Sequence, residues 1–148
     1  MKKFNFKLQG LQRFRAFKED KIKIELGEIV SRMNNLKGDN ARLDKDIGEA
    51  FENQNKLVSE MVGGSILHFF QYYINGKRET IRENKEKLKQ LRVEYEEKTV
   101  ELSQAMGEVK VIDSIRKRNY AEYKKYYNKT MQNDIEDILR MRKENRGE

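Results

Sequence analysis

The sequence predicts an all-α fold in which two long helices form an antiparallel coiled-coil hairpin, the second helix being longer and overhanging the first. Of its 148 residues 36% are hydrophobic, 39% are charged and none is proline. With a mean hydropathy of −1.00, this composition suits a narrow buried seam better than a compact core. Apolar residues recur in steps of three and four, as in coiled coils. We therefore expect one domain over 1–148, with helix one at about 4–62, a turn at about 63–65 and helix two at about 66–143.

The first helix is predicted from two apolar frames. From Ile22 onward, steps of four and three alternate over nearly six heptads, and ten of the twelve positions are apolar, which is a strong coiled-coil pattern. The seam positions are Ile22, Leu26, Ile29, Met33, Leu36, Asn40, Leu43, Ile47, Ala50, Gln54, Leu57 and Met61. A less regular series of apolar positions precedes them, and Phe6 lies off the seam. This series consists of Phe4, Leu8, Leu11, Phe14 and Phe17.

The only adjacent glycines, Gly63 and Gly64, predict the turn. Glycine takes positive φ without strain and is costly inside a helix, so this pair can end helix one. Ser65 is then a suitable N-cap for helix two. From Tyr127 to Glu148 the second helix should project alone, since helix one is too short to reach it.

The second helix carries two interleaved sets of seam positions, one largely apolar and one half polar. The first set is Leu67, Ile74, Ile81, Leu88, Tyr95, Leu102, Val109 and, after Arg116, Tyr123. The second is Phe70, Lys77, Asn84, Leu91, Lys98, Ala105, Ile112, Asn119 and Tyr126. Polar seam residues weaken a coiled coil but fix its register.

We predict a register in which the numbers of facing seam residues sum to 131, because the turn centre then falls between residues 65 and 66. In this register Leu43 faces Leu88, and two polar positions meet apolar ones. The further predicted pairs are Leu36 with Tyr95, Ile29 with Leu102, Ile22 with Val109, Asn40 with Leu91 and Ile47 with Asn84.

The residue inventory argues against enzyme chemistry. There is no cysteine, and the single histidine, His68, cannot form a multi-histidine site. No phosphate-binding glycine loop or metal-ligand cluster occurs, and carboxylates on a two-helix hairpin face water. No apolar run is long enough to span a bilayer, and the basic N-terminus lacks the apolar core of a signal peptide. We expect a cytoplasmic, non-enzymatic protein with no catalytic residue, cofactor or metal.

The formal net charge of +7 is uneven, at +6 in residues 2–23, −3 in 24–109 and +4 in 110–148. A hairpin would bring both basic regions to its open end, where an acidic partner could bind, although most charge runs are simply solvated faces. The bases there include Arg13, Arg15, Arg116, Lys117, Arg118, Lys124, Lys125, Arg140 and Arg142. Four tyrosines, Tyr120, Tyr123, Tyr126 and Tyr127, interleave with these bases. We expect Tyr123 and Tyr126 to pack against Phe4 and Leu8, although bases with aromatics could also bind nucleic acid.

An aromatic cluster follows the turn, with more apolar side chains than one seam can bury. Its members are Ile66, Leu67, Phe69, Phe70, Tyr72, Tyr73 and Ile74. It could be a hydrophobic cap that closes the hairpin, or a patch on which a partner docks.

Three local patterns together resemble the flagellar export protein family FliJ. They are the N-terminal Phe4-x-Phe6-x-Leu8-x-x-Leu11 followed by Arg13 and Arg15; Ser65 followed by Gln71-x-Tyr73-Ile74; and Arg116-Lys117-Arg118 through Tyr123 to Glu136-Asp137-Ile138. The resemblance covers essentially the whole chain, and it implies a soluble component of the bacterial flagellar type III export apparatus.

The resemblance further implies a stalk similar to the central subunit of rotary ATPases. Such a stalk binds the hexameric export ATPase, reaches the cytoplasmic domain of the membrane export gate, and binds export chaperones, which would make the cytoplasmic protein peripheral at the inner face of the membrane. The implied ATPase-ring set is Arg13, Arg15, Arg116, Lys117, Arg118 and Lys125. The implied export-gate set is Phe69, Phe70, Tyr73, Lys77, Thr80 and Asn84.

Two other functions remain open from the residues. The chain could be a generic coiled-coil adaptor or chaperone, including the stalk-like protein of injectisome secretion, which shares this architecture. It could also be a coiled coil that binds nucleic acid, in which case binding would fall steeply with salt. If the family resemblance holds, neither a small-molecule substrate nor nucleic acid is expected as a partner.

Overall fold

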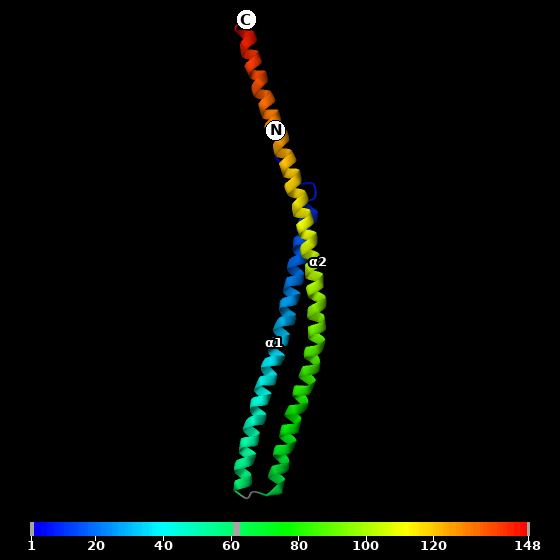
Figure 1. The fold of residues 1–148 in the computed structure, drawn as a ribbon, viewed down its shortest axis with the longest axis vertical. Helices are drawn as coiled ribbons and strands as arrows, with labels where there is room; N and C mark the ends of the chain where they lie inside the picture. The colour runs from blue at the N-terminus through cyan, green and yellow to red at the C-terminus, as the bar shows by residue number, and fades with distance from the viewer. Residues whose placement is uncertain (1, 61–62, 148) are drawn as a thin grey trace. The chain divides into compact units, whose positions relative to one another are not determined.

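The computed structural model describes residues 2–60 and 63–147, and these residues form two long helices (Figure 1). Helix α1 spans Gln9–Ser59, and helix α2 spans Gly64–Asn145. There is no strand in the described ranges. The predicted all-α hairpin, with a second helix longer than the first, is confirmed.

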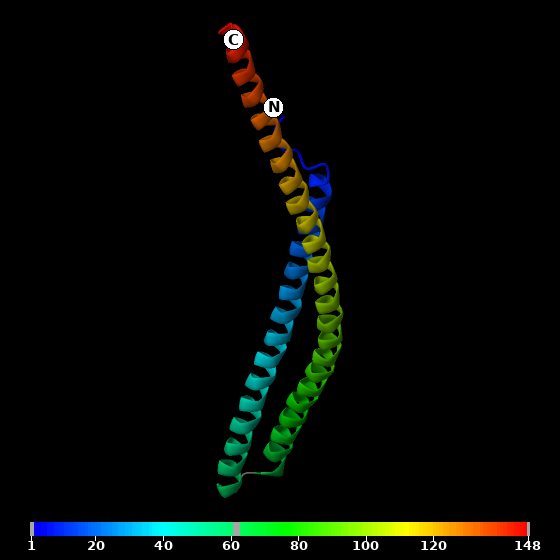
Figure 2. The ribbon, with the colours of Figure 1, turned by 45° about the horizontal axis from the view of Figure 1, so that its top comes forward.

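By their internal contacts the residues fall into two units. We call Lys21–Leu102 the hairpin unit, and Met1–Asp20 together with Ser103–Glu148 the terminal unit. In the hairpin unit, the α1 and α2 segments run antiparallel and side by side (Figure 2). Each unit has its own packing and is described separately below.

The hairpin unit is built on the predicted seam. Every predicted α1 seam residue from Ile22 to Leu57 is buried or half-buried, as the heptad period requires. The core cluster consists of Ile47, Ala50, Ile74 and Ile81, with Leu43, Phe70 and Tyr73 packed against it. Tyr95 departs from the prediction because 38% of it is exposed.

The predicted register is wrong by one heptad. The side-chain amide Nδ2 of Asn84 donates a 2.9 Å hydrogen bond to Oδ1 of Asn40, and both residues are buried. These numbers sum to 124 rather than 131, and Leu43 accordingly packs on the cluster that contains Ile81 instead of facing Leu88. A seven-residue shift leaves apolar positions facing one another, so apolar periodicity alone cannot choose between the two registers. The buried amides can, because each needs a polar partner.

The turn also differs from its prediction. Helix α2 begins at Gly64, so Ser65 lies inside its first turn and is not the N-cap. The amide of Ile66 donates to the carbonyl of Gly63 at 3.2 Å, and neither Gly63 nor Gly64 has positive φ. The predicted seam position Met61 and the predicted end of helix one at residue 62 lie outside the described residues.

In the terminal unit, the chain before α1 is not helical, so the prediction of a helix from about residue 4 is wrong. Phe6, predicted to lie off the seam, is only 5% exposed. Phe14 and Phe17, predicted to lie on it, are 62% and 68% exposed. Polar residues of α1 contact α2 in this unit: Gln12 Nε2 donates to Asp113 Oδ1 at 2.8 Å.

A physical reason for the difference lies in the heptad frame of α1. Continued backward from Ile22 in steps of three and four, this frame reaches Glu19, Arg15 and Gln12, and all three are half-buried. The helix therefore keeps its period, and the apolar side chains that do not fit it remain in solvent. Leu8 and Leu11 are also exposed, by 40% and 39%.

The C-terminal part of α2 is unpaired among the described residues. Tyr127 is half-buried, and every residue of 131–147 is exposed. The predicted overhang is therefore present. No helix in the described ranges is long and apolar enough to cross a membrane.

Candidate functional site

The terminal unit holds all of the excess positive charge. It contains 17 Lys and Arg against 10 Asp and Glu, whereas the hairpin unit contains 15 of each. The formal charges are therefore +7 and zero. The predicted ATPase-ring set lies entirely in this basic unit.

The bases of that set do not form one patch. Arg15 is half-buried, and its guanidinium donates to the backbone oxygen of Glu108 at 2.9 Å. Arg116 reaches Oε1 of Gln12 at 3.5 Å. Arg13, Lys117, Arg118 and Lys125 are exposed. Successive helical residues point about 100° apart, so the bases of 116–118 are distributed around α2, and the unit is positive on several sides.

Aromatic contacts attach the N-terminal segment to α2. The ring of Phe4 meets Tyr120 edge-on at 5.2 Å and Tyr123 at 5.5 Å between centroids. The hydroxyl of Tyr123 donates to the backbone oxygen of Lys2 at 2.7 Å. The expected packing of Tyr123 on Phe4 is confirmed, whereas Tyr126, predicted to lie on the seam, is 68% exposed. These intramolecular contacts occupy Tyr120 and Tyr123, which makes them less available for stacking on nucleic-acid bases.

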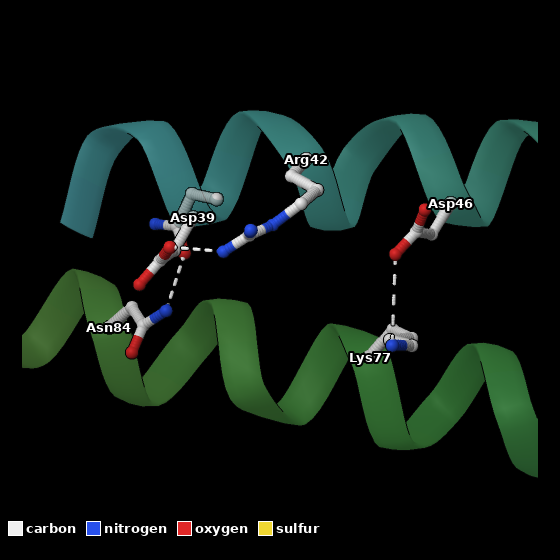
Figure 3. Close-up of polar contacts among 6 residues, drawn as sticks. Asp39, Arg42, Asp46, Lys77 and Asn84 are labelled. Atoms are coloured by element: carbon white, nitrogen blue, oxygen red, sulfur yellow. Dashed lines mark hydrogen bonds and ion pairs between the residues drawn. The ribbon is translucent and has the colours of Figure 1, made fainter. Parts of the chain in front are cut away.

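The predicted export-gate set divides between the seam and the surface. Asn84 is buried against Asn40. Lys77 lies 3.7 Å from a carboxylate oxygen of Asp46 across the seam (Figure 3) and 5.1 Å above the ring of Tyr73. Thr80 is exposed, and its hydroxyl donates to a backbone oxygen in its own helix. The structure therefore groups Tyr73 and Lys77 but turns Asn84 inward.

A shallow groove of about 180 Å³ lies beside the core cluster, and we call it the tip groove. Phe69, Phe70 and Tyr73 of α2 form its aromatic wall, and Asp46, Glu49, Ala50 and Asn53 of α1 line the rest. The α1 half of the groove was not predicted from the sequence, because identifying it requires the observed register. A groove lined by aromatic rings and carboxylates can hold an apolar side chain next to a basic one.

The outer surface beside the tip groove carries exposed aromatic rings. Phe69 is 63% exposed, Tyr72 81% and Ile66 41%. Phe69 also contacts Phe70 edge-on at 6.1 Å. Since Phe70 and Tyr73 pack on the core while Phe69 and Tyr72 do not, the aromatic cluster partly closes the hairpin and partly remains accessible.

A third polar contact crosses the seam of the hairpin unit. Nζ of Lys98 lies 2.5 Å from Glu25 and 3.1 Å from Glu101. The hydrogen bond from Lys98 lowers the pKa of Glu25 below its ordinary value, and the bonds to Glu25 and Glu101 raise the pKa of Lys98. Both charged forms are thereby favoured, so a lysine can occupy this seam position.

In the ranges 2–60 and 63–147, no group of three or more His, Cys, Asp or Glu side chains is placed to hold a metal ion. The arrangement instead offers charged and aromatic surfaces that could bind other macromolecules.

The family model described as "Flagellar FliJ protein" matches residues 4–148, which is nearly the whole chain. Neither a curated protein nor a solved structure matched in the other two comparisons. The family match agrees with the resemblance found in the sequence patterns.

Proposed function

We propose, from the premise that this chain belongs to the flagellar FliJ family and is a component of the flagellar export apparatus, that it acts as a non-enzymatic stalk. In this proposal it couples the hexameric export ATPase to the cytoplasmic domain of the export gate, and it also binds export chaperones. It would then be cytoplasmic and peripheral at the membrane through its partners.

The observation that carries the proposal is the separation of charge between the two units. The terminal unit, with net +7, suits a binding site lined by carboxylates, whereas the hairpin unit carries no net charge. Bases that point in several directions suit a partner that surrounds the helices, as the central opening of a ring would. Exposed Arg13, Arg118 and Lys125 would contact the ring directly, whereas Arg15 and Arg116 would first have to leave their internal partners.

The tip groove supports the gate-binding half of the proposal. Its aromatic rings and carboxylates form a recognition surface distinct from the basic terminal unit. Phe69 and Glu49 are both exposed there, so they are the groove residues best placed to contact a partner. Two chemically different surfaces on one chain allow two partners to bind together.

Coupling requires that the stalk bind some states of the ring more tightly than others. The test is ATP turnover by the purified cognate export ATPase, measured with and without this protein. We expect wild type to change the turnover and Arg116→Glu/Lys117→Glu/Arg118→Glu not to do so. Unchanged turnover at saturating wild-type protein would contradict the stalk function.

Gate binding is tested separately by titrating the cytoplasmic domain of the gate protein. Phe69→Ser with Glu49→Lys changes only exposed groove residues, whereas substitutions of Phe70 or Tyr73 would also disturb the core cluster. We expect the double variant to lose gate binding and to retain its effect on ATP turnover. Equal binding by the variant and wild type would remove the tip groove from the proposal.

A further inference from the structure

One flank of α2 in the hairpin unit carries a continuous stripe of basic residues that neither proposed contact uses. Its members, Arg78, Arg82, Lys85, Lys89 and Arg92, follow steps of four, three, four and three. At about 1.5 Å per residue the stripe extends for roughly 21 Å. This spacing is the heptad period, so all five side chains lie along one side of the seam, and we call them the basic flank.

Contacts inside the protein neutralise only part of this charge. Arg82 pairs with Glu79 at 2.5 Å and Lys89 with Glu86 at 3.9 Å, and all four side chains are more than half exposed. Lys85 and Arg92 form no ion pair with any of the described residues. Exposed pairs of this kind contribute little to stability, so the flank can exchange them for an external partner.

Beside the flank, α1 contributes one small side chain and three polar ones to a groove. This hollow of about 450 Å³ is lined by Lys85, Leu88, Lys89 and Arg92 of α2 and by Lys37, Asn40, Ala41 and Asp44 of α1. Further along, the guanidinium of Arg78 lies 5.5 Å from the ring centre of Phe51, which is 38% exposed. The flank therefore combines positive charge with apolar surface.

We propose that the basic flank and this groove bind an acidic amphipathic helix of a partner protein, which lies along the hairpin unit as a third helix. The heptad spacing of the bases matches carboxylates that recur with the same period on a helix. The groove with Phe51 would receive the apolar stripe of that helix. This inference does not rest on the proposed stalk function.

A polyanion such as nucleic acid fits this flank less well. Asp44 lines the same groove, and Glu79 and Glu86 alternate with the bases along α2. These carboxylates would repel a continuous row of phosphates, whereas a helix can place a neutral or basic side chain opposite each of them. Apolar contact at Phe51 also favours a protein helix.

The test is fluorescence anisotropy with a labelled synthetic peptide about three heptads long, with leucine at the seam positions and glutamate beside them. The variant is Lys85→Glu/Arg92→Glu. Its matched control is Arg32→Glu/Lys87→Glu, which also replaces one lysine and one arginine, here lining a groove on the opposite flank of the seam. Lys85→Gln/Arg92→Gln removes the charge without adding repulsion against Asp44, and circular dichroism checks that all variants fold.

We expect wild type and the control to bind the peptide, and both flank variants to bind about tenfold more weakly or worse, a change of roughly 1.4 kcal/mol. Equal weakening in the control would show general attraction to a basic protein and would overturn the proposal. Unchanged binding by the flank variants would do the same. A single-stranded oligonucleotide that binds more tightly than the peptide, and loses binding in the same variants, would assign the flank to nucleic acid instead.

Discussion

The buried pair of Asn40 and Asn84 predicts how the hairpin fixes its register. Asn84→Ala removes one hydrogen bond of 2.9 Å and leaves the amide of Asn40, 9% exposed, without its partner. Loss of the bond together with an unsatisfied buried amide costs about 1–3 kcal/mol. Replacing both asparagines by leucine should have the opposite sign, because a buried leucine contributes about 1.5–3 kcal/mol relative to an exposed one. Thermal unfolding followed by circular dichroism measures both changes.

Register itself can be measured with disulfides, because the chain has no native cysteine. Cysteines at 43 and 81 should crosslink, since Leu43 and Ile81 belong to one packed cluster. Cysteines at 43 and 88 should not, because one heptad along a helix is about 10 Å, and a disulfide needs Cα atoms within about 7 Å. In the double-leucine background we expect the 43–88 crosslink to become detectable. In the protein that keeps both Asn40 and Asn84, a 43–88 crosslink that forms as readily as the 43–81 crosslink would refute the register and its explanation.

Three further predictions concern stability. The pKa of Glu25 is lowered in the folded state by Lys98. The ionised carboxylate of Glu25 therefore stabilises the fold above its unfolded pKa, and this stabilisation is lost as pH falls through the folded pKa. Melting curves from pH 7 to pH 3 should show a smaller fall in melting temperature for Glu25→Gln than for wild type. Phe6→Ala should destabilise the terminal unit by about 3–5 kcal/mol, while Phe17→Ala, which changes an exposed ring, should have almost no effect on amide exchange there. Tyr123→Phe should cost about 0.5–1.5 kcal/mol and increase proteolysis before residue 9, and unchanged cleavage would show that its hydroxyl does not hold the N-terminal segment.

Apolar periodicity was sufficient to predict the helices and the seam of the hairpin unit. It could not predict the register, because a shift of seven residues exchanges one row of apolar contacts for another. The polar seam residues held that information: pairing Asn40 with Asn84 also brings Lys77 close to Asp46 and Lys98 close to Glu25. Requiring every buried polar group to have a partner would have selected the observed register from sequence.

Near the N-terminus, side-chain type misled the prediction. Because they are apolar, Phe14 and Phe17 are predicted to lie on the seam, yet the heptad period of α1 places Gln12 and Arg15 there. The two phenylalanines and the two polar residues lie on different faces of the helix, so they cannot both face α2. The period of 3.6 residues per turn, continued from the hairpin unit, determines which face does. Phe6 is buried, but it lies in the non-helical segment before α1. The period of a helix therefore could not predict its burial.

The candidate sites were less predictable than the fold because each needs both helices in register. From α2 alone, Asn84 belongs to the same row as Lys77, but the row faces the seam and the asparagine is buried. The carboxylates of the tip groove come from α1, at Asp46 and Glu49, and only the observed register brings them to Phe69.

A protein with so little buried surface can assign separate residues to folding and to binding. Among the described residues, only ten hydrophobic side chains are buried. Stability depends on the few seam residues such as Ile74 and Asn84, whereas Lys85, Arg92 and Phe69 are exposed. Substituting those exposed residues should change the free energy of unfolding by less than about 0.5 kcal/mol. A loss of binding in such variants therefore reports on the binding surface itself, and this separation makes the ring, gate and flank contacts distinguishable by mutation.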